Sequence, residues 1–384
     1  MPLSECLHSA LIADTLDEHD RSRVDDRGRR DVRQMKSPFL SHSPYLHRME
    51  TLGPAIDSLA RTNDFSGVVR VDLDDEVELA KAYGLAHRGH DIANTVDTQF
   101  AIASGGKGLT ALAIVSLIED GSLALSTTAR SVLGQDLPLI DDDVTIEHLL
   151  SHRSGIGDYL DEDAGHELTD YVMPVPVHEL ATTEQYLAVL DGHETRFPPG
   201  ERFAYNNGAY VVLALIAERT SGVPFHELVH RRVCEPAGME DSAFLRSDEL
   251  PGRAALGYLT TDGASRTNVF HLPVRGSGDG GIYSTVADIS SFWRSLFAGQ
   301  IVSADWVAEM VRARSDLPQA SRRYGLGFWL AGSNEGVMLV GSDAGVSFWS
   351  GHNRGRRATY TVISNTSDGA WPIGRLLAEK LPAS

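Results

Sequence analysis

The sequence predicts an α/β fold, more narrowly α+β, in which one sheet is built from both ends of the chain. Strand patterns occur near the two termini, at residues 66–73, 77–83, 336–340, 346–350 and 358–364. The middle of the chain, about residues 122–310, is instead rich in short helical patterns and Pro/Gly turns. Strands at both ends with helices between them imply one sheet covered by helices. We therefore expect one domain over residues 49–384, with a mainly helical subdomain inserted within about 122–310.

Residues 1–48 differ from the rest of the chain. Between residues 14 and 33, acidic and basic side chains crowd together with almost no apolar periodicity. Such a segment is typical of a disordered or loosely helical extension. Regular patterning starts at Met49, where we place the domain boundary.

The ordered part opens with a helical pattern and two strands. Apolar residues recur at helical spacing at Leu52, Ile56, Leu59 and Ala60. Two strand patterns follow, joined by an acidic turn. Residues 108–120 then form a strongly apolar helical pattern that ends at Gly121, and residues 373–380 close the chain as a final helix.

Composition and charge limit the classes of function. The 384 residues are 42% hydrophobic and 23% charged, which is typical of a soluble globular protein. A formal net charge of −19 argues against a nucleic-acid partner, since phosphates need a basic face. The sequence has neither a membrane-spanning apolar run nor the basic start of a secretory signal. We expect a cytoplasmic protein without a membrane partner, whose acidic runs at 141–143 and 161–163 are solvated loop charges.

Ser104-Gly105-Gly106-Lys107 places a hydroxyl and an amine three residues apart, where a helical pattern begins. Positions i and i+3 of a helix share a face, so Ser104 and Lys107 are expected to point the same way. A serine becomes nucleophilic when a neighbouring base takes its proton, and a lysine kept neutral by burial can help to do so. Taken alone, the tetrapeptide is better explained as a helix cap followed by a solvated lysine.

Further segments give this tetrapeptide a context. Tyr205-Asn206-Asn207 precedes an apolar helical pattern at residues 211–220. The accessory segments are His152-Arg153-Ser154-Gly155, Pro199-Gly200, Pro236-Ala237-Gly238-Met239 and Gly280-Gly281. In this order they closely resemble the serine β-lactamase / DD-peptidase superfamily, in its class C-like branch of esterases, D-aminopeptidases and penicillin-binding-protein-like hydrolases. The resemblance covers about residue 50 to the C-terminus and implies an antiparallel, β-lactamase-like sheet.

The resemblance also implies a role for each matching residue. Ser104 would be the nucleophile, Lys107 would hold and polarise it, and Tyr205 would be the general base, as a phenolate or as a hydrogen-bond relay. A phenol needs nearby cations to ionise near neutrality, and Lys107 would supply one. Asn207 would hydrogen-bond Lys107 or a substrate amide. Without the resemblance, Tyr205 would be a core tyrosine and Asn207 a cap of the following helix.

The third motif of the family is where this chain departs from the pattern. Relatives carry Lys-Thr-Gly or His-x-Gly on the strand beside the site, and the matching stretch here is Leu339-Val340-Gly341. Gly341 would let substrate approach the strand, and the N–H groups of Ser342 and Ser104 would form the oxyanion hole. The cation that helps to bind a substrate carboxylate is missing. Its loss argues against penicillins and against peptides with a free C-terminal carboxylate.

The sequence thus predicts a serine hydrolase without metal or cofactor, acting on a small ester, amide or short peptide through an acyl-enzyme on Ser104. The insertion 158–193 is expected to wall its cleft. His148 and His152 lack the glutamate and third ligand of a zinc site, and are expected to be structural. Two other hypotheses stay open: a catalytically silent binding or scaffold protein, and a D-amino-acid peptidase or β-lactamase.

Overall fold

The computed structural model describes residues 44–162, 170–261, 264–317, 322–332 and 336–381. Most of the predicted N-terminal extension, up to residue 43, lies outside these residues. Helix α2 (Pro44–Thr62) begins before Met49, so the predicted domain boundary falls inside a helix.

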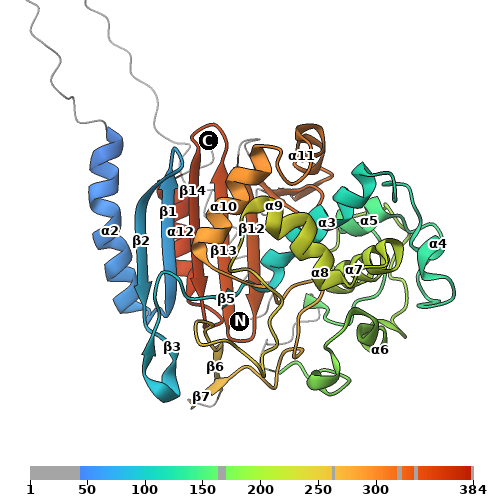
Figure 1. Ribbon diagram of the computed structural model, residues 1–384, viewed down its shortest axis with the longest axis horizontal. Helices are drawn as coiled ribbons and strands as arrows, with labels where there is room; N and C mark the ends of the chain where they lie inside the picture. Colours follow the sequence, from blue (N-terminus) through green and yellow to red (C-terminus); the bar gives the residue numbers. More distant parts are fainter. Residues whose placement is uncertain (1–43, 163–169, 262–263, 318–321, 333–335, 382–384) are drawn as a thin grey trace, which may run out of the picture.

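An eight-stranded antiparallel sheet forms the centre of the molecule, with strand order β2-β1-β14-β13-β12-β11-β10-β9 (Figure 1). Its strands are β1 (Gly67–Leu73), β2 (Glu76–Tyr83), β9 (Ser315–Leu317), β10 (Arg322–Tyr324), β11 (Trp329–Ala331), β12 (Gly336–Asp343), β13 (Val346–Asn353) and β14 (Ala358–Ser364). Short pairs form from β3 (Leu85–His87) with β4 (Ile92–Ala93), β5 (Phe100–Ala101) with β8 (Tyr283–Ser284), and β6 (Tyr258–Thr261) with β7 (Ala264–Thr267). Because β1 pairs with β14 from Gly67↔Ser364 to Leu73↔Ala358, the predicted sheet from both termini is confirmed.

Helices cover both faces of this sheet (Figure 1). The remaining helices are α3 (Lys107–Glu119), α4 (Ala129–Leu133), α5 (Ile146–Leu150), α6 (Leu187–Leu190), α7 (Asn207–Ser221), α8 (Phe225–Val229), α9 (Glu235–Ala237), α10 (Val286–Phe297), α11 (Ala304–Met310) and α12 (Ala370–Lys380). On one face, Ile56 of α2 and Trp371 of α12 share a buried cluster with Val69 and Val362. On the other face, α3 and α10 pack in a second cluster that continues into the helices on the right of Figure 1.

The inserted helices form a subdomain around α7, which contacts α3, α4, α5 and α8. Helix α10 lies inside the predicted insertion but packs against β1 and β14, so it belongs to the layer that covers the sheet. Among the described helices, none is both long and apolar enough to cross a bilayer.

Helix α3 joins the sheet to the subdomain and carries the predicted lysine. Every residue from 107 to 117 is buried, so this helix is covered on all sides, as a helix between two layers must be. At Gly108, an added Cβ would lie 2.6 Å from a methyl carbon of Leu339. The missing side chain therefore lets α3 pack closely on β12, and its first turn starts beside that strand.

Candidate active site

Ser104 lies in a 3₁₀ turn, η2 (Ala103–Gly106), that runs directly into α3. Ala103 holds a left-handed backbone with φ of 45°, a conformation that costs a non-glycine residue about 1–2 kcal/mol. The turn is pressed onto the sheet, since a Cβ at Gly105 would lie 2.4 Å from the ring of Phe348. Packing against β12 and β13 therefore holds the strained turn that presents Ser104.

The Lys107 side chain, only 2% exposed, contacts three oxygens. Its Nζ lies 2.9 Å from Ser104 Oγ, 2.8 Å from Asn207 Oδ1 and 2.7 Å from the carbonyl oxygen of Asp279. Burial lowers the pKa of Lys107, although nearby carboxylates, first Asp279 and Glu162, act in the opposite direction. The predicted pair thus meets in a site that favours a neutral amine.

The two uses that the sequence left open for Asn207, capping the helix and contacting Lys107, fall to two neighbouring residues, Asn206 and Asn207. Asn206 is the cap of α7, because its Oδ1 accepts the N–H of Ala209 at 2.7 Å. Asn207 does not cap the helix, and its Oδ1 accepts a hydrogen bond from Lys107 Nζ. Asp158 completes the helix start by accepting the N–H groups of Asn207 and Gly208 at 2.8 and 2.9 Å. Of the two uses expected for Asn207, the structure therefore shows the contact with Lys107.

Tyr205 lies beside the lysine, with Lys107 Nζ 5.0 Å from the centroid of its ring. Its ring lies between His152, at 4.3 Å between centroids, and Trp329, stacked at 6.0 Å. Burial, reinforced by the charge of Glu162, raises the pKa of Tyr205 well above 10. The expected phenolate is therefore disfavoured, because desolvation favours the neutral phenol. The alternative role as a neutral hydrogen-bond relay fits this environment.

His152 is the structural histidine that the sequence predicted. It is fully buried, and its Nδ1 accepts the N–H of Asn206 at 3.1 Å. His148 closes a capping box with Thr145 at the start of α5. In the described parts of the chain, no three His, Cys, Asp or Glu side chains are grouped to hold a metal ion. His152 thus helps to position the Tyr205 segment through packing and one hydrogen bond.

Strand β12 brings the third motif to the site. In the described part of the sheet, β11 pairs with β12 at Val337 and Met338, before the residues that approach Ser104. A Cβ on Gly341 would lie 2.1 Å from the carbonyl oxygen of Ile102 and 3.0 Å from the backbone nitrogen of Ser104. At Gly341 the strand thus lies against the backbone of the turn that carries Ser104, and Ser342 lines the same pocket as Ser104.

The end of this strand adds a residue that the motif did not include. Leu339 is buried in the core against Gly108, so it does not stand where a cation would face substrate. The side chain that reaches the pocket from the end of β12 is Asp343, a carboxylate. Strand alternation could have found it, because Leu339, Gly341 and Asp343 share one face of the strand. The motif has therefore not merely lost a cation: it places an anion beside the site.

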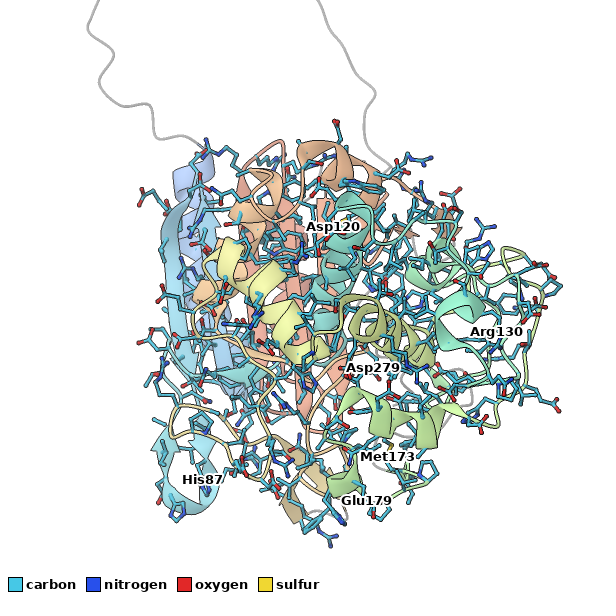
Figure 2. All side chains as sticks on the ribbon, turned by 45° about the vertical axis from the view of Figure 1, so that its right-hand side comes forward. His87, Asp120, Arg130, Met173, Glu179 and Asp279 are labelled. Carbon is cyan, nitrogen blue, oxygen red and sulfur yellow. The ribbon has the colours of Figure 1, made fainter. Side chains whose placement is uncertain are left out.

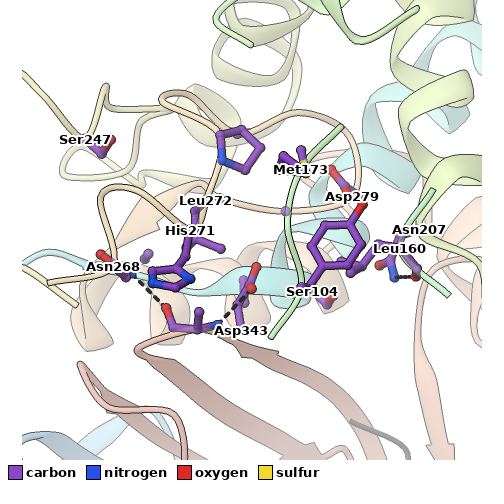
Figure 3. A pocket seen from close by; sticks show the side chains of 18 of the residues that line it. Ser104, Leu160, Met173, Asn207, Ser247, Asn268, His271, Leu272, Asp279 and Asp343 are labelled. Atoms are coloured by element: carbon purple, nitrogen blue, oxygen red, sulfur yellow. Dashed lines mark hydrogen bonds between the residues drawn. The ribbon is translucent and has the colours of Figure 1, made fainter. Parts of the chain in front are cut away.

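The pocket over Ser104 encloses about 1000 Å³, including its open mouth. Figure 3 shows Ser104 between Asp343 and Asn207. The insertion 158–193 walls the pocket as expected, through Tyr159, Leu160, Glu162, Tyr171, Met173 and Tyr186. Figure 2 shows Met173 below Asp279, another residue of the lining.

Glu162 corrects the prediction of a solvated acidic run at 161–163. Its Oε1 accepts the Asn207 side-chain amide at 3.1 Å, and its Oε2 is buried. Asp279 also lines the pocket, and its carboxylate accepts the hydroxyl of Tyr159. No local pattern signals these two acids, because only the fold brings residues 162 and 279 to Lys107. Asp163 lies outside the described residues.

Comparisons with known proteins agree with this geometry. Residues 53–374 match the family model described as Beta-lactamase. The crystal structure of a penicillin binding protein from Bacillus halodurans superposes with a TM-score of 0.80 and 32% identity, covering 84% of this chain and 98% of that one. PbpX of Bacillus subtilis (strain 168) is 29% identical over 286 residues, which are 71% of this chain and 65% of PbpX. Esterase EstB of Burkholderia gladioli is 32% identical over 198 residues, 48% of this chain and 47% of EstB.

The chain thus spans less than two thirds of these two curated relatives. The family model nevertheless covers most of this chain, and the sheet from both termini and the turn that presents Ser104 lie within it. On this evidence the chain belongs to the Beta-lactamase family.

Proposed function

We propose that this protein is a serine hydrolase that cleaves an ester or amide through an acyl-enzyme on Ser104. The observation that carries the proposal is the position of the buried Lys107 amine, 2.9 Å from Ser104 Oγ. A hydroxyl at this distance from a neutral amine can lose its proton to it as the hydroxyl oxygen attacks a carbonyl.

The other contacts of the amine favour this proton transfer. Asn207 Nδ2 donates to the carbonyl oxygen of Leu160 at 3.0 Å, which leaves Asn207 Oδ1 as an acceptor for Lys107. The carbonyl oxygen of Asp279 is also purely an acceptor. A neutral amine has two N–H groups for these two oxygens, and its lone pair then faces the Ser104 hydroxyl. After protonation its third N–H faces Oγ, so Lys107 can take and return a proton without moving.

The reaction proceeds in two halves. In the first half, Ser104 Oγ bonds to the carbonyl carbon while its proton passes to Lys107. The bond to the leaving group then breaks. The leaving oxygen or nitrogen takes a proton from the neutral Tyr205 hydroxyl, which in turn takes the proton held by Lys107. Water attacks the acyl-enzyme by the same proton route, which releases the acid and restores Ser104. We assign the N–H groups of Ser104 and Ser342 to the oxyanion, supported by the close approach of β12 at Gly341.

Esters and amides without a free carboxylate rank above β-lactams as substrates. Asp343 and Glu162 both line the pocket, and Glu162 also contacts Asn207 there. Both carboxylates would repel a substrate carboxylate. The similarity to an esterase, EstB, supports the same ranking. A D-amino-acid amide also satisfies it, whereas a penicillin does not.

A fluorophosphonate probe and p-nitrophenyl butyrate test the proposal. The wild type should be labelled and should hydrolyse the ester, and Ser104→Ala should lose both activities. Ser131→Ala is the matched control, because Ser131 is an exposed serine in α4 that bonds to Thr128. A folded wild type that is neither labelled nor active would refute the proposal and favour the catalytically silent hypothesis.

A further inference from the structure

We infer that the pocket over Ser104 binds a substrate with a positive charge, an ammonium group held by Asp343 and Glu162. The inference rests on the proposed function and specifies the class of its substrate. It places the ammonium on a part of the substrate away from the reacting carbonyl.

The charge of the pocket is the first observation. Its described lining includes the carboxylates of Glu162, Asp279 and Asp343. Apart from His271, none of the described lining residues is basic. Lys107 lies beneath this lining, and its amine is engaged by Ser104, Asn207 and Asp279. The contacts described for the lysine thus include no hydrogen bond to Glu162 or Asp343, although the charges of both acids act on its pKa.

The second observation is a buried carboxylate oxygen that has no hydrogen-bond donor. Glu162 Oε2 is buried without a partner, and Glu162 lines this pocket. Buried polar atoms are normally paired, and an unpaired acceptor in a residue that lines the cavity points to a missing donor. An ammonium group supplies three N–H donors and a positive charge.

Asp343 and the pocket tyrosines complete this environment. Asp343 Oδ1 accepts the N–H of Ala344 at 2.8 Å, which fixes the carboxylate at the pocket end of β12. The acid of Asp279 is instead engaged by the hydroxyl of Tyr159 and forms part of the wall. The rings of Tyr159 and Tyr171 also line the pocket, and aromatic faces attract cations.

Strand geometry sets the distance between the ammonium and the scissile bond. Gly341 lies against the backbone of Ser104, and Asp343 follows two residues later on the same strand. Two residues of a strand span about 7 Å. A linear chain of roughly six bonds between carbonyl carbon and nitrogen covers this span, which suggests 6-aminohexanoyl as a probe.

The test compares three p-nitrophenyl esters of similar length: those of 6-aminohexanoic acid (cationic), heptanoic acid (neutral) and adipic acid as its monoester (anionic). We expect kcat/KM to decrease in that order. Asp343→Asn and Glu162→Gln should each lower the cationic-to-neutral ratio by about tenfold or more, because each removes one partner of a buried charge pair. Both variants keep an amide oxygen for the existing contact with Ala344 or Asn207.

Glu179→Gln is the matched control, because Glu179 is an exposed acid outside the pocket lining. Glu179→Gln should leave the cationic-to-neutral ratio of kcat/KM unchanged. If the ratio instead depended on the net charge of the whole protein, this variant would lower it as well. Melting temperatures report folding of each variant, and the charge ratio is insensitive to a merely structural loss.

A second measurement separates this inference from the proposed function. Calorimetry on Ser104→Ala compares hexylammonium with 1-hexanol and hexanoate, independently of catalysis. Preferential binding of hexylammonium that weakens in Asp343→Asn supports the inference, even if no ester is hydrolysed. Equal hydrolysis of the three esters, a ratio unchanged in both variants, or no preference for hexylammonium would overturn it.

Discussion

Gly341→Ala is expected to disable the site by moving the strand away from the nucleophile. The new Cβ would lie 2.1 Å from the carbonyl oxygen of Ile102, 2.9 Å from the backbone nitrogen of Gly105 and 3.0 Å from that of Ser104. Ordinary van der Waals contact begins at about 3.5 Å. All three atoms belong to the backbone, so no side-chain rotation can relieve the overlap.

The strand or the η2 turn must therefore shift by roughly 1 Å. Overpacking of this kind costs about 1–3 kcal/mol of stability, and a shift of about 1 Å at a reacting group lowers the rate by roughly 100-fold. We expect kcat/KM for p-nitrophenyl butyrate to fall by about that factor, with a lower melting temperature but a cooperative unfolding transition.

Gly53→Ala is the control, since its Cβ would meet its nearest atoms at 3.8 Å and alanine suits the interior of α2. It should keep activity and stability. If Gly341→Ala retains kcat/KM within about twofold of the wild type, strand β12 does not hold Ser104 in place.

Three further results are expected. Lys107→Gln and Tyr205→Phe should each lower kcat by about 100- to 10,000-fold, the usual contribution of a group that moves a proton; fluorophosphonate labelling as fast as in the wild type would contradict their roles. Because burial raises the pKa of Glu162 and Asp343 to about 7, the cationic-to-neutral ester ratio should rise between about pH 6 and 8; a flat ratio would contradict the ammonium site. Ionising a buried acid whose pKa is raised from 3.8 destabilises the folded state as pH rises towards 7. Asp343→Asn should thus raise the melting temperature relative to the wild type by more at pH 8 than at pH 5, and an equal change at both would show that Asp343 ionises freely.

Much of the fold could be predicted because its main elements have clear local patterns. The helix after Ser104 and the strands near both termini were predicted close to their observed bounds. The layer that α10 joins has no such local signal, since the helix has an ordinary amphipathic pattern and only its packing against β1 and β14 assigns it to the sheet. Local periodicity predicts an element, but not the layer that the element joins.

The contact between Ser104 and Lys107 was predictable from sequence because they lie three residues apart, in a turn whose geometry brings both side chains together. The order of the other motifs along the chain indicated the family, again from the sequence alone. The state of Tyr205 was not predictable, because its pKa depends on burial beneath His152 and Trp329, residues far away in the chain.

By itself, the sequence indicated the family and the chemistry that we propose, through Ser104, Lys107 and the order of the motifs. Only the tertiary structure decided the charge of the pocket. Glu162 looked like a solvated loop acid and Asp343 lay beyond the aligned motif, yet both reach the cavity beside Ser104. The physical reason is that a hydroxyl and an amine one turn apart meet through local backbone geometry, whereas acids from distant segments meet only when the sheet and the insertion close around one cavity.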